Sequence, residues 1–82
     1  MGTFSLDELQ TIARGVIGDR SIALSAEGMA EDVPGWDSLS HTLIIMEVNE
    51  KLGIELPPNR AARARNFQHL VKMIQNELAR AR

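Results

Sequence analysis

Apolar residues recur at helical spacing near the start of the chain. At about 100° per residue, one stripe collects Leu6, Leu9, Ile12, Ala13, Val16 and Ile17. Ser5 and Glu8 form a capping-box pattern in front of this stripe, and Gly18 followed by Asp19 is a suitable stop. The pattern predicts an amphipathic helix that begins after Ser5 and ends before Gly18.

Two further helices are predicted in the second half of the chain. One runs from about Ser38 to Leu52, where Gly53 occupies the position favoured for a left-handed cap. The other begins at about Asn66, its expected N-cap, and places these apolar residues on one face: Phe67, Leu70, Val71, Ile74 and Leu78.

The segment between these two helices contains Pro57 and Pro58, which prevent the second helix from continuing directly. A short helical turn is predicted beyond them, over residues 61–64. No segment alternates convincingly with period two, so no strand is expected. The expected fold is therefore all-α, a four-helix bundle with three main amphipathic helices and a short third helix.

A long connection, residues 19–37, joins the first helix to the second. Loops longer than about 12–15 residues are uncommon in compact domains and are often functional. Five apolar residues are expected to anchor this connection to the core: Ile22, Leu24, Met29, Val33 and Trp36. The connection ends at Asp37 and Ser38, so the start of the second helix is the first place to look for chemistry.

The second helix has apolar residues on two faces. Ile44, Ile45, Val48 and Leu52 form the expected core stripe, whereas Leu39, Leu43 and Met46 lie in a separate sector with Glu47 and Glu50 beside them. Three explanations are open: the long connection covers the second sector, its apolar residues are isolated surface residues without a role, or the sector is a docking face for partner proteins. A flexible methionine among apolar residues rimmed by acids suits transient contacts.

Length and composition narrow the possible functions. The 82 residues suffice for one domain, residues 1–82, with one modest core. The absence of cysteine excludes disulfides, thiolate metal sites and an intrinsic nucleophilic thiol, and two separated histidines give no metal-ligand cluster. The N-terminal residues lack a basic start followed by a long apolar run, so we expect neither a secretory signal nor a membrane span. We therefore expect a cytoplasmic protein.

Charge is unevenly distributed along the chain. Residues 1–58 hold ten acidic against three basic residues, whereas residues 59–82 hold one against six, which gives the two parts −7 and +5. The basic part includes Arg60, Arg63 and Arg65, but only Asn66 and Phe67 nearby could read bases, so we do not expect nucleic-acid binding. These arginines are more typical of a solvated or partner-facing surface.

The stretch Gly35-Trp36-Asp37-Ser38-Leu39, followed by a helix that ends Leu52-Gly53-Ile54-Glu55-Leu56-Pro57, resembles the acyl carrier protein family. The resemblance covers most of the chain and implies that Ser38 carries 4′-phosphopantetheine, installed from coenzyme A by a phosphopantetheinyl transferase with magnesium. The physics of the site agrees, because the free amides at a helix N-terminus favour a phosphodiester. The arm would supply the thiol that the sequence lacks.

The resemblance also implies roles for the neighbours of Ser38. Partner recognition would involve Asp37, Leu39, Leu43 and Met46, and the acidic border of the same sector adds Glu47 and Glu50. The partners would be the transferase, a ligase that loads an acyl or aminoacyl group, and downstream biosynthetic enzymes. Ile44, Ile45 and Val48 correspond to residues that line the space where some carriers shelter an acyl chain. We expect a monomer that carries its cargo as a thioester and is not itself an enzyme.

The sequence also departs from common members of that family. Leu43 and Asn49 stand at positions that are often acidic in fatty-acid carriers, and Trp36 interrupts the glycine pair that usually precedes the serine of peptidyl carriers. These departures favour a free-standing carrier for a specialised pathway.

Two other functions are weighed against the carrier. His41 lies one helical turn from Ser38, but no glycine-rich oxyanion loop accompanies the pair, so a Ser-His nucleophile is disfavoured and a packed histidine at the helix start is expected. His69 is expected on the surface. The main alternative is a small helical interaction module whose Ser38 stays unmodified.

Overall fold

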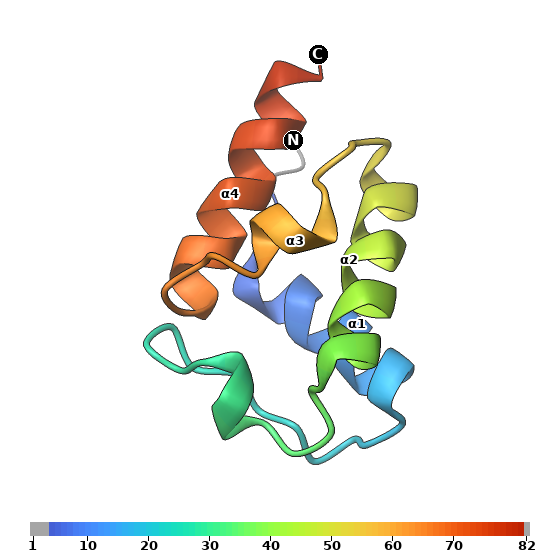
Figure 1. Cartoon of the computed structure of the whole chain (residues 1–82), viewed down its shortest axis with the longest axis vertical. Coiled ribbons are helices and arrows are strands. Elements are labelled where there is room, and N and C mark those ends of the chain that lie inside the picture. Colours follow the sequence, from blue (N-terminus) through green and yellow to red (C-terminus); the bar gives the residue numbers. More distant parts are fainter. Residues whose placement is uncertain (1–3, 82) are drawn as a thin grey trace.

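The computed structural model describes residues 4–81, and all regular structure in this range is helical (Figure 1). The order of the elements is α1 (Leu6–Ile17), the single 3₁₀ turn η1 (Ala30–Asp32), α2 (Ser38–Leu52), α3 (Pro58–Ala61) and α4 (Phe67–Arg80). The predicted all-α fold with three main helices and a short third one is confirmed. No helix in this part of the chain is long and apolar enough to cross a membrane.

Local signals set most of the helix ends. Ser5 and Glu8 make the reciprocal capping box of α1, with 3.2 Å from the Ser5 amide to Glu8 Oε1 and 3.3 Å from the Glu8 amide to Ser5 Oγ. Gly18 and Gly53 end α1 and α2 in the left-handed conformation, with φ of 81° and 66°. Glycine adopts this conformation without the steric cost that a Cβ atom brings.

The predicted position of the third helix is wrong by three residues. The expected turn at residues 61–64 is observed at Pro58–Ala61, with Pro58 as its first residue. Proline is favoured at the first position of a helix, because its fixed φ suits the helix and the amide that it lacks has no intrahelical partner there. The same residue that prevents α2 from continuing therefore begins α3.

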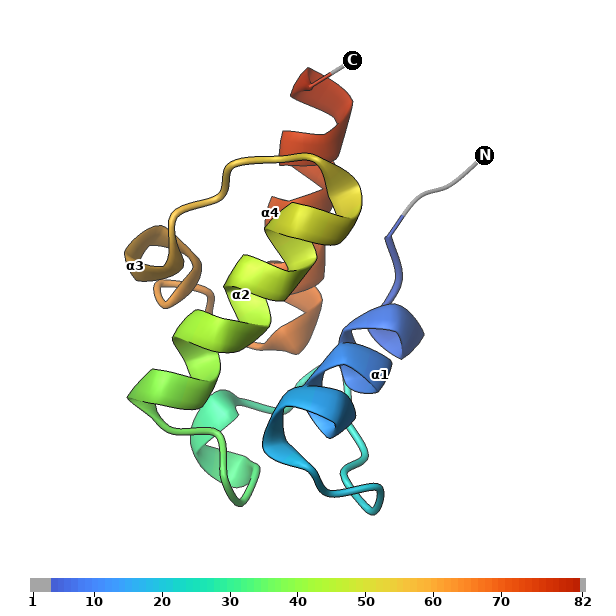
Figure 2. The same cartoon turned by 90° about the vertical axis from the view of Figure 1, so that its right-hand side faces the viewer.

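The core lies where α1 packs against α2 and α4, while α3 packs against α2 (Figure 2). Each main helix contributes its predicted apolar stripe, including Leu9 and Ile12 from α1, Ile44, Ile45 and Val48 from α2, and Leu70 and Ile74 from α4. Among the described residues, no polar or charged residue is buried. Helical periodicity therefore identified the core correctly.

The connection between α1 and α2 is hydrogen-bonded to α1 and to the start of α4. At its beginning, Arg14 Nε donates to the Ile22 carbonyl at 2.7 Å, and the Leu24 amide donates to Gln10 Oε1 at 2.9 Å. Further along, the carbonyls of Gly28 and Ala26 accept the first two amides of α4, those of Phe67 and Gln68, at 2.9 and 3.0 Å. The loop thereby satisfies donors that a helix start leaves without an intrahelical partner.

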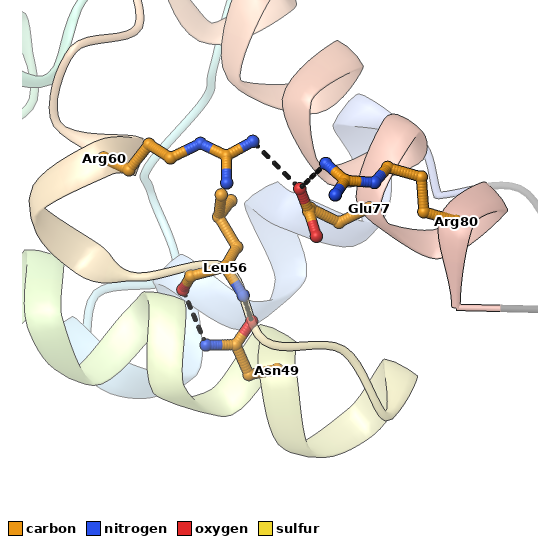
Figure 3. Close-up of polar contacts among 5 residues, drawn as sticks. All are labelled: Asn49, Leu56, Arg60, Glu77 and Arg80. Carbon is orange, nitrogen blue, oxygen red and sulfur yellow. Dashed lines mark hydrogen bonds and ion pairs between the residues drawn. The ribbon is translucent and has the colours of Figure 1, made fainter.

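The segment that leads from α2 into α3 is held by side chains (Figure 3). Asn49 Nδ2 donates to the carbonyl of Leu56 at 2.9 Å, and the Leu56 amide donates to Asn49 Oδ1 at 3.0 Å. On the other side, Arg60 of α3 and Arg80 of α4 both reach Glu77 Oε2, at 2.9 and 3.2 Å. The side chain of Asn49 therefore satisfies both the amide and the carbonyl of Leu56, whose side chain is fully buried.

Replacing Asn49 with alanine is expected to destabilise the protein by about 1–3 kcal/mol, because both backbone polar groups of the buried Leu56 lose their partner. Urea unfolding measures the loss. The matched control is Asn76→Ala on the exposed face of α4, which should change stability by less than about 0.5 kcal/mol. Equal stabilities for the Asn49→Ala variant and the wild type would contradict the assigned role.

Candidate functional site

Ser38 is the first residue of α2, and its side chain is exposed. Asp37 provides the N-cap, since its Oδ1 accepts the amide of Ser40 at 2.8 Å. The Ser38 carbonyl accepts the hydroxyl of Thr42 at 3.1 Å, whereas the Ser38 hydroxyl makes no hydrogen bond to the described residues. The neighbouring carboxylate does the capping, which leaves the Ser38 hydroxyl at the helix tip unengaged.

The Asp37 carboxylate is stabilised by the helix that it caps. Its pKa is lowered from the ordinary value of 3.8, first by the hydrogen bond from the Ser40 backbone amide and second by the Ser40 side chain. A carboxylate that accepts hydrogen bonds is favoured in its charged form. Asp37 is therefore negatively charged beside Ser38 at neutral pH.

An open groove of about 800 Å³ lies next to Ser38. Its apolar lining includes Trp36, Phe67 and Leu70, and Ser38 itself lines it, as do Ala62 and Ala64 beyond α3. The rings of Trp36 and Phe67 lie 5.0 Å apart, a distance typical of packed aromatic pairs. The groove gives anything attached to Ser38 an apolar surface to lie on.

The three α2 residues expected to line a shelter for cargo do not line this groove. Ile44, Ile45 and Val48 are fully buried in the core. The groove is lined instead by the α1–α2 connection, the first turn of α2, α3 and the start of α4.

His41 ties three segments together beside the groove. Its Nδ1 accepts the Trp36 indole N–H at 3.2 Å, and its Nε2 lies 3.0 Å from the carbonyl of Pro58. An indole only donates and a carbonyl only accepts, so His41 carries its proton on Nε2. Neither nitrogen keeps a free lone pair to take a proton from Ser38. The geometry therefore supports the packed histidine and not a Ser-His pair.

A solved structure closely resembles this fold. The solution NMR structure of a holo acyl carrier protein from Geobacter metallireducens matches with a TM-score of 0.80 and 34% sequence identity, over 99% of this chain and 91% of that one. This chain belongs to the acyl carrier protein family. No protein-family model matches the sequence, and no curated protein matches it.

The second apolar face of this acyl carrier protein is open to solvent. The exposed fractions are 68% for Leu39, 44% for Leu43 and 55% for Met46, so the α1–α2 connection does not cover them. Glu50 beside them is exposed, and Glu47 is partly exposed. The structure therefore places all the predicted partner-recognition residues on or next to one accessible face of α2 that begins at Asp37 and Ser38.

Two sequence interpretations near the site need correction. Met29 was expected to anchor the connection in the core, but it is 42% exposed and lines the groove, because the loop turns into η1 at this point. His69 was expected on the plain surface, but it is half-buried and its Nδ1 accepts the backbone amide of Arg65 at 2.9 Å.

Sequence reasoning also missed the groove itself. Trp36, Phe67 and Leu70 have the helical or aromatic pattern of core residues, and nothing in their spacing shows that one side of this cluster lines a groove beside Ser38.

Within residues 4–81, no three or more metal-ligating side chains lie close enough together to hold a metal ion.

The lowered pKa of Asp37 predicts how its contribution to stability changes with pH. The charged cap stabilises the folded state above the ordinary pKa, and this contribution disappears as the pH falls through the lowered folded-state pKa. The stability difference between wild type and Asp37→Asn should therefore be largest at neutral pH and shrink on acidification to below 3.8. Urea unfolding over a pH series measures it; a pH-independent difference would contradict a charged cap.

Proposed function

We propose that this acyl carrier protein carries 4′-phosphopantetheine on Ser38 and presents an acyl or aminoacyl group to partner enzymes. One observation carries the proposal: the Ser38 hydroxyl is exposed and unengaged at the tip of α2, because Asp37 does the capping. Membership of the family supports Ser38 as the attachment point, since the sequence Asp37-Ser38-Leu39 lies at the start of α2.

The residues around Ser38 fit the proposed group. The N-terminus of a 15-residue helix directs free backbone amides and the positive end of its dipole toward a phosphodiester on the first residue. Asp37 opposes this effect with its negative charge, but it lies outside the helix and accepts one of the amides itself. When bound, the arm supplies a thiol for thioester formation, which this chain without cysteine cannot provide.

The proposed modification is a simple substitution at phosphorus. The Ser38 oxygen would attack the phosphorus of coenzyme A that bears the pantetheine, forming one P–O bond while the pyrophosphate P–O bond breaks and 3′,5′-adenosine diphosphate leaves. The serine proton would pass to a base of the transferase, and magnesium would balance the phosphate charge. His41 cannot serve as that base, since both of its nitrogens are engaged. The carrier contributes position, and the chemistry belongs to the transferase.

The exposed face of α2 serves as the docking surface in this proposal. Leu39, Leu43 and Met46 offer apolar contacts beside the attachment point, and Glu47 and Glu50 offer charges at the edge. Enzymes that load the cargo and enzymes that use it need the same access to the arm, so one adaptable face suits several transient partners. The departures at Leu43, Asn49 and Trp36 from common fatty-acid and peptidyl carriers favour partners dedicated to one specialised pathway.

Treating the protein with coenzyme A, magnesium and a broad-specificity phosphopantetheinyl transferase is expected to add the mass of one phosphopantetheine. Intact-protein mass spectrometry measures the addition, which Ser38→Ala should abolish. Ser40→Ala is the matched control: it lies in the same helical turn, and the backbone amide that Asp37 holds is retained. A bare wild-type protein would favour the alternative, an interaction module with unmodified Ser38.

A further inference from the structure

Two exposed arginines, Arg63 and Arg65, follow directly after α3. Within residues 4–81, the ion pairs converge on Glu77, which holds Arg60 and Arg80. Arg63 and Arg65 take part in none of them, and both side chains are exposed. The fold therefore neutralises Arg60 and leaves these two arginines available.

Arg63 and Arg65 belong to the segment that borders the groove opposite α2, although neither side chain lines the groove itself. Ser38 lines this groove on the α2 side, and Ala62, Ala64 and Asn66 line it on the other side. Arg63 and Arg65 alternate with these three residues along the chain, so they stand at the rim of the groove, and Arg65 also lines a second hollow with His69 and Lys72. An enzyme surface that covers Ser38 and the groove therefore reaches the arginines as well.

The near side of the groove carries the opposite charge. Asp37 and Glu31 both line the groove and are exposed, and α2 continues with Glu47 and Glu50 beside its apolar face. Ser38 thus lies between an acidic and apolar surface on α2 and a basic surface after α3. A membrane or a nucleic acid presents one sign of charge over a wide area, so it would meet repulsion on the α2 side. A protein surface can present both signs.

We propose that the phosphopantetheinyl transferase that modifies Ser38 presents an acidic patch to Arg63 and Arg65 while its apolar surface receives Leu39. The inference rests on the proposed function. The transferase is the partner at issue because its reacting atoms must reach Ser38 Oγ itself, which brings its surface against both walls of the groove. Enzymes that act at the far end of the arm are under no such requirement.

Acidic residues on the α2 side of Ser38 and the basic patch, Arg63 and Arg65, on the other side together determine how a partner can approach. Complementary charges on either side of the reacting oxygen favour one orientation of the transferase and disfavour the orientation rotated by half a turn, in which like charges meet. They also speed the encounter, an effect that salt weakens. Arg63 and Arg65 are therefore assigned as orienting residues for the modification.

The test compares two double variants with equal changes in net charge. Arg63→Glu/Arg65→Glu removes the two arginines, and Arg20→Glu/Lys51→Glu reverses two exposed basic residues whose neighbours along the chain do not line the groove. The substrate is the unmodified carrier, and the enzyme is the phosphopantetheinyl transferase of the same organism. We expect kcat/KM for the first variant to fall roughly tenfold or more at low salt, with a much smaller loss at high salt. The control should stay within about twofold.

Several results would overturn the proposal. An unchanged or higher kcat/KM for Arg63→Glu/Arg65→Glu, or an equal loss in the control, would show that the patch does not orient the transferase. Binding of the wild type to anionic vesicles or duplex DNA that depends on both arginines would assign the patch to a polyanion. Wild type that is never modified would refute the proposed function as well, which is a different outcome from normal modification without an arginine effect.

Folding of the variants must be checked separately. The circular dichroism of both double variants should match that of the wild type, because all four side chains are exposed. The control should melt slightly lower, since Lys51→Glu places a negative charge in the last turn of α2. The milder Arg63→Gln/Arg65→Gln variant keeps the test valid if charge reversal disturbs the fold. It should show a smaller loss in kcat/KM with the same salt dependence, and the absence of any loss would contradict the proposal.

Discussion

The cap of α2 is the interaction on which the site depends. A helix start needs acceptors for its free amides, and either a serine or an aspartate can supply one. Here Asp37 accepts a hydrogen bond from the Ser40 amide, so the Ser38 hydroxyl is not needed as the cap of α2. A one-residue shift of the cap would engage Ser38 in the helix and withdraw the hydroxyl from solution chemistry.

The rest of the fold holds that helix start in place. The long connection before it is bonded to α1 through Arg14 and Gln10, and to the first amides of α4 through its own carbonyls. Trp36 then links the end of the connection to His41 and packs on Phe67. The exposed hydroxyl therefore lies on a helix tip that contacts with α1, α4 and His41 hold in place. A fixed position suits a group that a separate enzyme must reach.

Local sequence signals were enough to predict the three main helices and the second apolar sector of α2, but not whether the connection covers that sector. Capping residues, glycine stops and helical periodicity act over a few residues, so Ser5, Asn66 and the separation of Leu43 from Ile44 could be assigned without tertiary information. The groove, the exposure of Met29 and the bonds of His41 and Asn49 depend on which segments meet in space. Periodicity contains no information about that, and the start of α3 was missed because a proline can both end and begin a helix.

Amide hydrogen exchange across α2, before and after phosphopantetheine is attached, tests the central claim most directly. The account predicts that the amides from Ser40 to Leu52 keep their protection when Ser38 is modified, because the cap belongs to Asp37. Loss of protection in the first turn on modification would show that the Ser38 hydroxyl helps to hold the helix start, and would contradict the account.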